Sequence, residues 1–404
     1  MPFDVEKARA DFPILSRQIN GKPLIYLDSG ASAQKPEAVI EAMAQSMRHS
    51  YANVHRGLHR LANETTDAYE AGRDTVARFI GADTNEIVFT KSATEAANLV
   101  AFSFGEGLKV GDEILTTEME HHANIVPWYM LAERKGLVLK YVPIRDDGSL
   151  DMDAFASMLT ERVKIVAVTH MSNVLGTINP IADIIKKAHA AGAKVVVDGA
   201  QGIVHMPVDV KALDADFYFF SSHKLYGPTG LGVLYAKAAL LAAMPPYQGG
   251  GEMIAHVTKE KITWNEPPHR FEAGTPAILE VIGLKAAIDW LGQFDRDEIA
   301  AHEHALYQRA HDRLMQINSL RVHGEAAGKG SILTFSLGQA HAHDVAQILD
   351  RYNVAVRAGT HCAEPLMTRL GVTSTVRASI ALYNTEEEID VLAEAVAKAQ
   401  SFFA

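Results

Sequence analysis

The chain has 404 residues, 48% of them hydrophobic and 22% charged, which is typical of a soluble globular enzyme with room for a large domain and a smaller one. A formal net charge of −11 argues against nucleic acid as a partner, because nucleic-acid binding needs clustered lysine and arginine. No stretch approaches the ~18 consecutive apolar residues of a membrane helix, and the mixed-charge start is unlike a signal peptide, so we expect a cytoplasmic protein with no membrane partner.

The first part of the chain is predicted to be mostly helical. Residues 1–20 predict a short helix with a connector, and residues 23–28 predict a short strand. Apolar positions at three- and four-residue spacing predict helices over 36–50 and 63–81. The segment between these helices, 51–59, is a polar loop with several ionisable side chains.

From residue 86 onward, strands and helices alternate. The apolar runs that predict strands are 86–90, 112–117, 164–169, 194–198, 216–221 and 232–235. Helices are expected to open near Thr94 and to span 180–191. This alternation implies a mainly parallel sheet with helices on both faces, an α/β fold in which ligands bind beyond the carboxyl ends of the strands.

After about residue 260 the pattern changes to an α+β set. Residues 266–276 predict a loop and 278–316 one or two long helices. Short strands (331–336, 354–356, 375–380) and helices (343–352, 386–400) follow. We therefore expect a large α/β domain of residues 21–265 and a small α+β domain formed by 1–20 and 266–404.

Two strand ends carry a lysine and an acid. Lys224 follows the buried strand 216–221, where loss of hydration lowers the pKa of an amine and lets it form a Schiff base with a carbonyl. Asp198 ends the preceding strand. A lysine for the aldehyde and an acid for the pyridinium nitrogen are what pyridoxal phosphate needs. The alternative is an N-cap aspartate and a surface lysine.

Candidates for holding a phosphate follow two strands. They are Thr94, at a helix N-terminus with free backbone N–H groups, and Ser221 and His223 beside Lys224. Simple capping by Thr94 is the alternative and is compatible with phosphate binding. The glycines after Lys224 lack the Gly-x-Gly-x-x-Gly spacing of a dinucleotide site and predict a turn into the next strand.

The histidines do not predict a metal site. His121 and His122 are adjacent in a loop after a strand, a poor arrangement for chelation, and no third ligand lies nearby in sequence. The pairs 302/304 and 341/343 lack an HExxH-like pattern and are predicted to be solvated. The sharper hypothesis is a His121 that stacks on a cofactor or shuttles a proton.

The small domain supplies two further candidates. Arg377 lies in an apolar strand, where a buried arginine is costly unless paired and where its planar fork suits a substrate carboxylate; an internal salt bridge is the alternative. Cys362, the only cysteine, cannot form an internal disulfide. The alternative is a buried structural thiol, but the polar loop with Arg357 and His361 favours a nucleophilic thiolate.

Ten short motifs in order along the chain resemble the cysteine desulfurases of pyridoxal-phosphate fold type I, most nearly the SufS/CsdA group, within the class-V aminotransferase family. The motifs are Tyr-Leu-Asp-Ser-Gly-Ala-Ser (26–32), Asn-Val-His-Arg-Gly (53–57), Thr-Glu-Ala-Ala-Asn (94–98), Glu-His-His-Ala-Asn (120–124), Ser-Asn-Val-Leu-Gly (172–176), Asp-Gly-Ala-Gln (198–201), Ser-Ser-His-Lys (221–224), Glu-Ala-Gly-Thr-Pro (272–276), Arg-Ala-Gly-Thr-His-Cys-Ala (357–363) and Arg-Ala-Ser (377–379). The cysteine loop is the discriminating motif. The resemblance implies a large domain with a mainly parallel, seven-stranded type of sheet and a smaller α+β domain that carries the catalytic cysteine.

The resemblance also implies roles for individual residues. Lys224, Cys362 and His121 are implied as catalytic, with His121 stacked on the cofactor ring. The implied pyridoxal 5′-phosphate ligands are Lys224, Asp198, Gln201, His121, Thr94, Ala93 (through its backbone), Ser221, His223 and, from the other subunit of a homodimer, Thr275. Substrate binding is implied for Arg377, Asn173, Arg357 and His55. Two positions depart from the family pattern: Thr360, where many relatives have histidine, and the turn Lys91-Ser-Ala-Thr94.

The implied reaction converts L-cysteine to L-alanine and leaves a persulfide on Cys362 for iron–sulfur cluster assembly. The loop around Cys362 is short, so we expect a separate SufE- or CsdE-like protein to accept the sulfur. The alternatives are a selenocysteine lyase acting on L-selenocysteine, another fold type I lyase such as a cysteine sulfinate or kynurenine-type enzyme, and a non-catalytic sulfur-carrier subunit.

Overall fold

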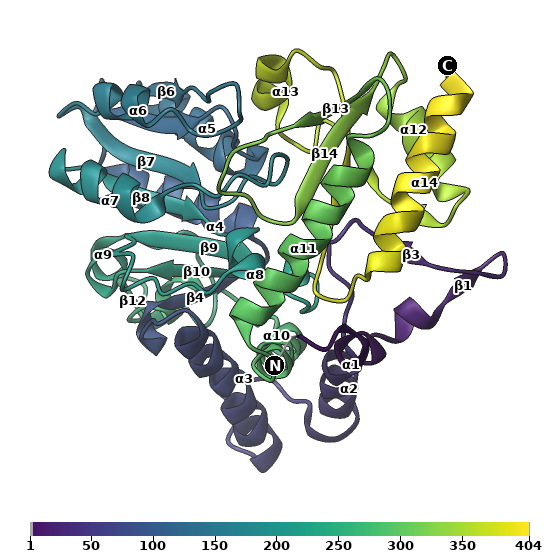
Figure 1. Ribbon diagram of the computed structural model, residues 1–404. Coiled ribbons are helices and arrows are strands. Elements are labelled where there is room, and N and C mark those ends of the chain that lie inside the picture. Colours follow the sequence, from purple (N-terminus) through teal and green to yellow (C-terminus); the bar gives the residue numbers. More distant parts are fainter. Residues whose placement is uncertain (1–2, 404) are drawn as a thin grey trace.

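The computed structural model describes residues 3–403 and is built on a seven-stranded sheet (Figure 1). The strand order is β4-β10-β9-β8-β7-β5-β6. The strands are β4 (Ile87–Thr90), β10 (Gly232–Ala236), β9 (Phe217–Ser221), β8 (Lys194–Asp198), β7 (Val163–Thr169), β5 (Glu113–Thr117) and β6 (Val138–Val142). Only β10 pairs antiparallel, with β4 and β9, so the predicted mainly parallel sheet is confirmed.

Alternate residues of these strands point into two different hydrophobic cores. Phe217 and Phe219 belong to the core that also holds helices α4 (Ala93–Leu99) and α5 (Val126–Lys135). Tyr218 and Phe220 belong to the core on the other face, with α3 (Arg60–Phe79), α7 (Ile181–Ala190) and α10 (Ile278–Leu291). Because successive side chains of a strand point to opposite faces, a sheet covered by helices on both sides needs strands that are apolar throughout. The sequences of these strands therefore show no alternation of apolar and polar residues, as expected.

A second, antiparallel sheet has the order β13-β14-β17-β16. Its strands are β13 (Leu320–His323), β14 (Ile332–Leu337), β17 (Thr375–Ser379) and β16 (Arg357–Gly359). Helices α11 (Arg296–Leu314), α12 (Ala342–Asp350) and α14 (Glu386–Phe403) share a separate hydrophobic core with it, and α11 and α14 lie side by side (Figure 1). Strand β3 (Ile25–Tyr26) joins this part by parallel pairing with β15 (Val354–Ala355).

The chain crosses between the two sheets more than once. Helix α10 follows residue 265, yet it packs on α3 and on α2 (Glu37–Gln45) and contributes to the core of the large sheet. Helix α1 (Val5–Ala10) places Arg9 against Glu388 of α14 at 2.6 Å. The division into 21–265 and 1–20 plus 266–404 stays a prediction.

Several elements differ from those expected along the sequence. The helix predicted over 36–50 ends as α2 at Gln45, and a wider π-helical turn follows over Ser46–Ser50. Strand β6 lies at the edge of the sheet, where its half-exposed, mixed sequence gives no buried apolar run. The hairpin of β11 (Ile254–Val257) and β12 (Ile262–Trp264) is exposed and was not expected for the same reason. Of the helices between residues 3 and 403, none has the length and apolar character needed to cross a membrane.

Candidate active site

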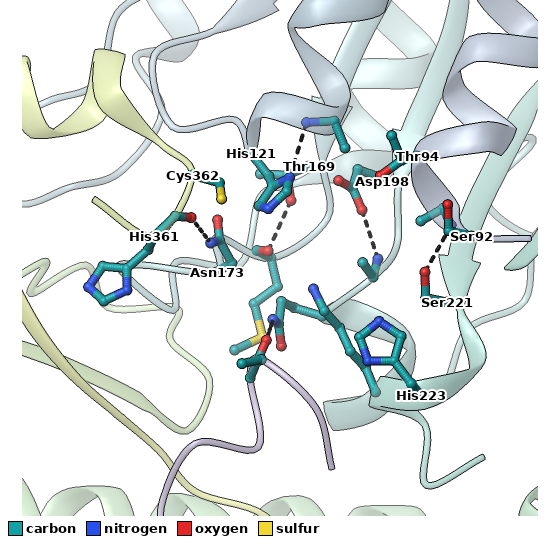
Figure 2. A pocket seen from close by; sticks show the side chains of 18 of the residues that line it. Ser92, Thr94, His121, Thr169, Asn173, Asp198, Ser221, His223, His361 and Cys362 are labelled. Carbon is teal, nitrogen blue, oxygen red and sulfur yellow. Dashed lines mark hydrogen bonds between the residues drawn. The ribbon is translucent and has the colours of Figure 1, made fainter. Parts of the chain in front are cut away.

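A cavity of about 210 Å³ lies at the carboxyl ends of the central strands, between the two sheets (Figure 2). It brings together twelve of the fourteen site residues predicted from the sequence. They are Ala93, Thr94, His121, Asn173, Asp198, Gln201, Ser221, His223, Lys224, Arg357, Cys362 and Arg377. His121 follows β5, Asn173 follows β7, and Asp198 and Ser221 end β8 and β9. The small sheet supplies Arg357 and Arg377, which face each other on β16 and β17.

Lys224 lies in the tight turn Ser222–Lys224 that follows β9, partly exposed at the cavity. Burial lowers the pKa of its amine to about 8, against the opposing effect of the Asp198 carboxylate. Burial also raises the pKa of Asp198, while Lys224 lowers it. A buried carboxylate keeps its charge only where a cation faces it. Asp198 is therefore suited to pair with a protonated pyridine nitrogen.

The backbone of Lys224 is held by a second lysine that the sequence analysis did not single out. The carbonyl oxygen of His223 accepts hydrogen bonds from the Ala33 N–H (3.1 Å) and from the Lys35 ammonium (3.0 Å). Lys35 is largely buried, and burial lowers its pKa to about 8. Its charge strengthens the hydrogen bond to the carbonyl that directly precedes Lys224. Lys35 therefore positions Lys224 from the N-terminal segment.

Helix α4, at the predicted phosphate-binding region, is capped by a different residue from the one expected. Ser92, not Thr94, caps helix α4, since its hydroxyl accepts from the Glu95 N–H at 3.2 Å. The alternative prediction that Thr94 simply caps the helix is therefore wrong. Thr94 lies exposed in the first turn of α4. The Ala93 N–H donates to the Ser221 hydroxyl at 2.8 Å, so this N–H already has a partner. Burial lowers the pKa of His223 to about 4, which makes its imidazole neutral.

His121 is a neutral imidazole. Burial, and next the charge of Lys224, lower its pKa to about 3. Its Nδ1 accepts the Ala123 N–H at 3.1 Å (Figure 2), so we infer that the ring proton sits on Nε2. A neutral ring with Nδ1 occupied and a proton on Nε2 is suited to stacking or hydrogen-bond donation, and not to taking a proton through Nε2.

Glu120, directly before His121, is a fully buried carboxyl that the sequence analysis did not weigh. Its oxygens accept from the Thr117 hydroxyl (2.7 Å), the Thr169 N–H (2.9 Å) and the Asn124 amide (2.7 Å). It thereby ties the ends of β5 and β7 to the segment that carries His121. Burial raises its pKa to about 8. A glutamate in a polar motif gives no sequence signal of such burial.

Arg377 is 2% exposed and makes the internal salt bridge that was the alternative to substrate binding. One terminal nitrogen donates to the Asn173 carbonyl (2.8 Å), and the other pairs with Asp28 at 3.3 Å. The buried Nε has no acceptor among the described residues. Gln201, expected to bond the cofactor, donates from its amide to the Gly30 carbonyl at 2.8 Å. A positively charged arginine among the residues that line a cavity favours an anionic ligand there.

Cys362 is exposed at the cavity, so the alternative of a buried structural thiol is wrong. The loop is held at two points: the Asn173 amide donates to the His361 carbonyl (2.9 Å), and the His122 N–H donates to the Cys362 carbonyl (2.7 Å). His361 and Cys362 both have left-handed backbone, with φ of +53° and +54°. Two adjacent non-glycine residues in this region cost about 1–3 kcal/mol each, which the loop contacts must offset.

The expected contribution of His361 to a thiolate is also wrong. Its ring is buried and faces Thr375, with Nε2 3.0 Å from the Thr375 hydroxyl oxygen. Burial, and then the charge of Arg377, lower its pKa to about 3. The ring is neutral near pH 7 and provides no positive charge, which leaves Arg357 as the cation of that pair.

Two predicted residues lie outside the cavity. Thr275 is exposed and borders a second cavity of about 350 Å³, together with Tyr69 and Glu272. His55 is exposed, and its Nε2 lies 2.8 Å from Glu70 Oε1. Their implied roles in cofactor and substrate binding stay predictions.

Two buried histidines predict how stability changes with pH. Burial lowers the pKa of His170 to about 4 and, with the charge of Arg377, that of His361 to about 3. The unfolded chain binds these protons near pH 6.5, so their stabilisation is complete above that pH and is lost as the pH falls toward 4. Each accounts for up to about 1.4 kcal/mol per pH unit in that window. Urea unfolding of the cofactor-free protein is expected to show this loss between about pH 7 and about pH 5.

The matched variant for that measurement is His170→Asn/His361→Asn. It removes both protonation sites and is expected to lose stability less steeply as the pH falls. An equal slope for the two proteins would contradict the assignment of these rings as neutral.

Comparison with known proteins adds the family. The class-V aminotransferase model matches residues 25–392. The cysteine desulfurase of Dickeya dadantii (strain 3937) is 53% identical over 393 residues, which cover 96% of this chain and 95% of that protein. The crystal structure of the cysteine desulfurase CsdA (S-sulfonic acid) from Escherichia coli superposes with a TM-score of 0.93 at 43% identity, covering 99% of each chain. The apo cysteine desulfurase of Thermococcus onnurineus NA1 gives 0.95 at 40% identity, over 100% of this chain and 99% of the other.

Proposed function

Since the chain belongs to the class-V aminotransferase family, we propose that its cavity converts L-cysteine to L-alanine and leaves the sulfur on Cys362 as a persulfide. The chain is a pyridoxal 5′-phosphate-dependent cysteine desulfurase with the fold type I architecture. The exposed Cys362 thiol and the Lys224 amine border one cavity. A lyase without sulfur transfer has no need of that thiol.

The residues of the cavity fit the cofactor. Lys224 is placed to hold its aldehyde and Asp198 to pair with its ring nitrogen, while His121 lies where a flat neutral ring can stack. Ser221, His223 and Thr94 gather at the end where the phosphate is expected. When bound, pyridoxal phosphate supplies an electron sink for the bonds broken at the substrate α-carbon.

The chain's own groups account for the other parts of the reaction. Arg377, with Asn173 beside it, is placed to bind the substrate carboxylate, and Arg357 adds a second positive charge. The Lys224 amine, with its pKa lowered to about 8, removes the α-proton. The Cys362 sulfur then forms a bond to the substrate sulfur while the carbon–sulfur bond breaks, its electron pair going to carbon, which takes up a proton.

The activity is tested by supplying the purified holoenzyme with L-cysteine and a reducing thiol. The expected products are alanine and sulfide in equal amounts. Alanine with no sulfide released, or pyruvate and ammonia in place of alanine, would contradict a desulfurase. A parallel assay with L-selenocysteine tests the alternative function. Turnover of L-selenocysteine without turnover of L-cysteine would identify a selenocysteine lyase.

A separate protein is proposed to take the sulfur from Cys362. The backbone contacts of His361 and Cys362 fix the loop, and the Glu364 N–H adds a third contact, to the His122 ring at 3.2 Å. A loop held this way does not carry its persulfide away, whereas its exposed thiol can be reached from outside. We expect turnover to rise several-fold when a SufE- or CsdE-like acceptor is added. Equal turnover with and without it would count against the relay.

We also propose a homodimer and a role in iron–sulfur cluster assembly in the cytoplasm. Thr275 is exposed and away from its own chain's cavity, as a residue that completes the partner's cavity would be. The dimer is checked by light scattering of the holoenzyme. Thr275→Ala is expected to weaken retention of the cofactor during dialysis, compared with the matched control Thr258→Ala on the exposed β11–β12 turn.

A further inference from the structure

A cavity of about 310 Å³, separate from the active site, lies between α11 and the loop of residues 324–331 that joins β13 to β14. Its lining residues are His304, Tyr307, Gln308 and His311 of α11, and Glu325, Ala326, Ala327 and Lys329 of the loop. None of these residues lines the active-site cavity. The cavity therefore has polar and titratable side chains that the desulfurase reaction does not use.

The amine of Lys329 is fixed at this cavity by two contacts. Its Nζ donates a hydrogen bond to the Gly324 carbonyl and lies 5.1 Å from the centre of the buried Tyr307 ring. Burial lowers the pKa of Lys329 to about 8, against the opposing effect of Glu325. At pH 7.5 about a quarter of amines with that pKa are neutral, compared with about 0.1% for an ordinary lysine. Lys329 is thus a nucleophile near neutral pH.

The open space beside the amine distinguishes Lys329 from two other lysines whose pKa is also lowered to about 8 by burial. Lys224 is the residue proposed to hold the cofactor. Lys35 donates to the Ala33 and His223 carbonyls and does not line the active-site cavity. Of the three amines, Lys329 is therefore the one that a reagent from solution can reach in the holoenzyme.

The groups around the cavity suit acyl transfer to an amine. In that reaction the neutral amine attacks the carbonyl carbon of an activated acyl group, and the bond from that carbon to its phosphate or thiolate leaving group breaks. The nitrogen then loses a proton, and His304 and His311 border the same cavity with imidazoles that can accept it. The products are an amide on the lysine and free phosphate or thiol, with no oxidation or reduction.

We propose that Lys329 is an acylation site, modified by small activated acyl donors, acyl phosphates or acyl thioesters, that enter the cavity between α11 and the 324–331 loop. Acylation removes the positive charge of the side chain and with it the cation–π contact to Tyr307. It also replaces a charged donor to the Gly324 carbonyl with a neutral one, which makes a weaker hydrogen bond.

The 324–331 loop is joined to the segment that carries a predicted substrate-binding residue. The Gly330 N–H donates to the Gly176 carbonyl at 2.8 Å, and Lys329 itself pairs with Thr177 in an antiparallel bridge. Three residues before Gly176, Asn173 donates its amide to the backbone of the cysteine loop at 2.9 Å. Acylation is therefore expected to weaken binding of L-cysteine. This consequence rests on the proposed function, whereas the acylation itself does not.

The test is the acetylation rate of individual lysines in the holoenzyme at pH 7.5, followed by mass spectrometry of peptides. Acetyl phosphate is the donor in one arm and acetyl-coenzyme A in the other, and the faster arm identifies the carrier of the acyl group. We expect Lys329 to react at least tenfold faster than Lys211, an exposed lysine whose pKa is raised by its hydrogen bond to Asp83. Lys35 is expected to react no faster than Lys211.

Two results would overturn the site: a Lys329 rate no higher than that of Lys211 in both arms, or a Lys35 rate equal to that of Lys329, since the cavity would then be irrelevant. Glu325→Gln removes the charge that raises the pKa of Lys329 and is expected to increase the rate about threefold. The matched control, Asp312→Asn, removes another exposed carboxylate near His311 and is expected to react like the native chain. A slower Glu325→Gln variant would also contradict the proposal.

The effect on the active site is measured by titrating holoenzyme variants with L-cysteine and following the absorbance. Lys329→Gln, uncharged like the acylated residue, is expected to weaken binding at least threefold, while Lys329→Arg keeps the charge and stays within twofold of the native chain. Equal binding by the two variants would contradict the link to Asn173. A native chain with no response to L-cysteine would instead contradict the proposed function, and the acetylation rates would still decide the site.

Discussion

Replacing Lys224 by alanine is expected to lower the rate of alanine formation from L-cysteine by at least about a thousandfold. A positioned general base accounts for about 10²–10⁴ in rate, and Lys224 is also the residue placed to hold the cofactor aldehyde. It is the only lysine among the residues that line the cavity, and the nearby Lys35 amine is bound to the His223 carbonyl. The measurement is the initial rate of alanine release under saturating L-cysteine.

The absorbance spectrum provides a second readout for Lys224→Ala. The variant is expected to lose the visible band that depends on the amine, while Asp198 and the phosphate-binding residues still retain cofactor. The matched control is Lys211→Ala, a lysine at the surface that pairs with Asp83. A Lys224→Ala variant with a rate within tenfold of the native enzyme would contradict the role assigned to this residue.

Replacing Cys362 by serine is expected to abolish the persulfide and to lower sulfur delivery to an acceptor by at least about a hundredfold. A hydroxyl is a far weaker nucleophile toward sulfur than a thiol near neutral pH. The residues proposed to bind L-cysteine, Arg377 and Asn173, lie on other elements, so the spectral change on adding L-cysteine is expected to persist. Loss of delivery with binding retained separates a sulfur-accepting role from a structural one.

The loop needs its own control because its backbone is strained at residues 361 and 362. Thr360→Ser changes a neighbouring side chain in the same loop and is expected to keep sulfur delivery within about twofold. If Cys362→Ser delivered sulfur as fast as Thr360→Ser, the thiol would be a bystander. A reduced rate in both variants would instead indicate that the conformation of the loop limits turnover.

The large sheet and most of the cavity could be predicted from the sequence. Strands buried on both faces appear as continuous apolar runs, and the residues that end them, such as Asp198, are brought to one edge by the parallel arrangement. Arg377 was conspicuous because a charge in an apolar strand needs a partner. The edge strand β6 and the hairpin β11–β12 were missed, because exposed strands carry no comparable pattern.

The properties that were missed depend on tertiary contacts. The sequence alone does not show that the Glu120 carboxylate accepts hydrogen bonds from three donors. Nor does it show that Lys35 binds the carbonyl of His223, directly before Lys224. His361 was expected to favour a thiolate, yet its ring faces Thr375 and is neutral. The cavity beside Lys329 likewise depends on how α11 packs against a separate loop. Sequence identifies the chemical groups, whereas burial decides their charge.

The mass of the peptide containing Cys362, after the holoenzyme has reacted with L-cysteine without reductant, tests the central claim most directly. We predict a gain of one sulfur atom on that peptide, with one alanine released per sulfur bound. The gain should disappear on reduction and in Cys362→Ser. Alanine release with an unmodified Cys362 peptide would contradict the claim that this thiol accepts the sulfur.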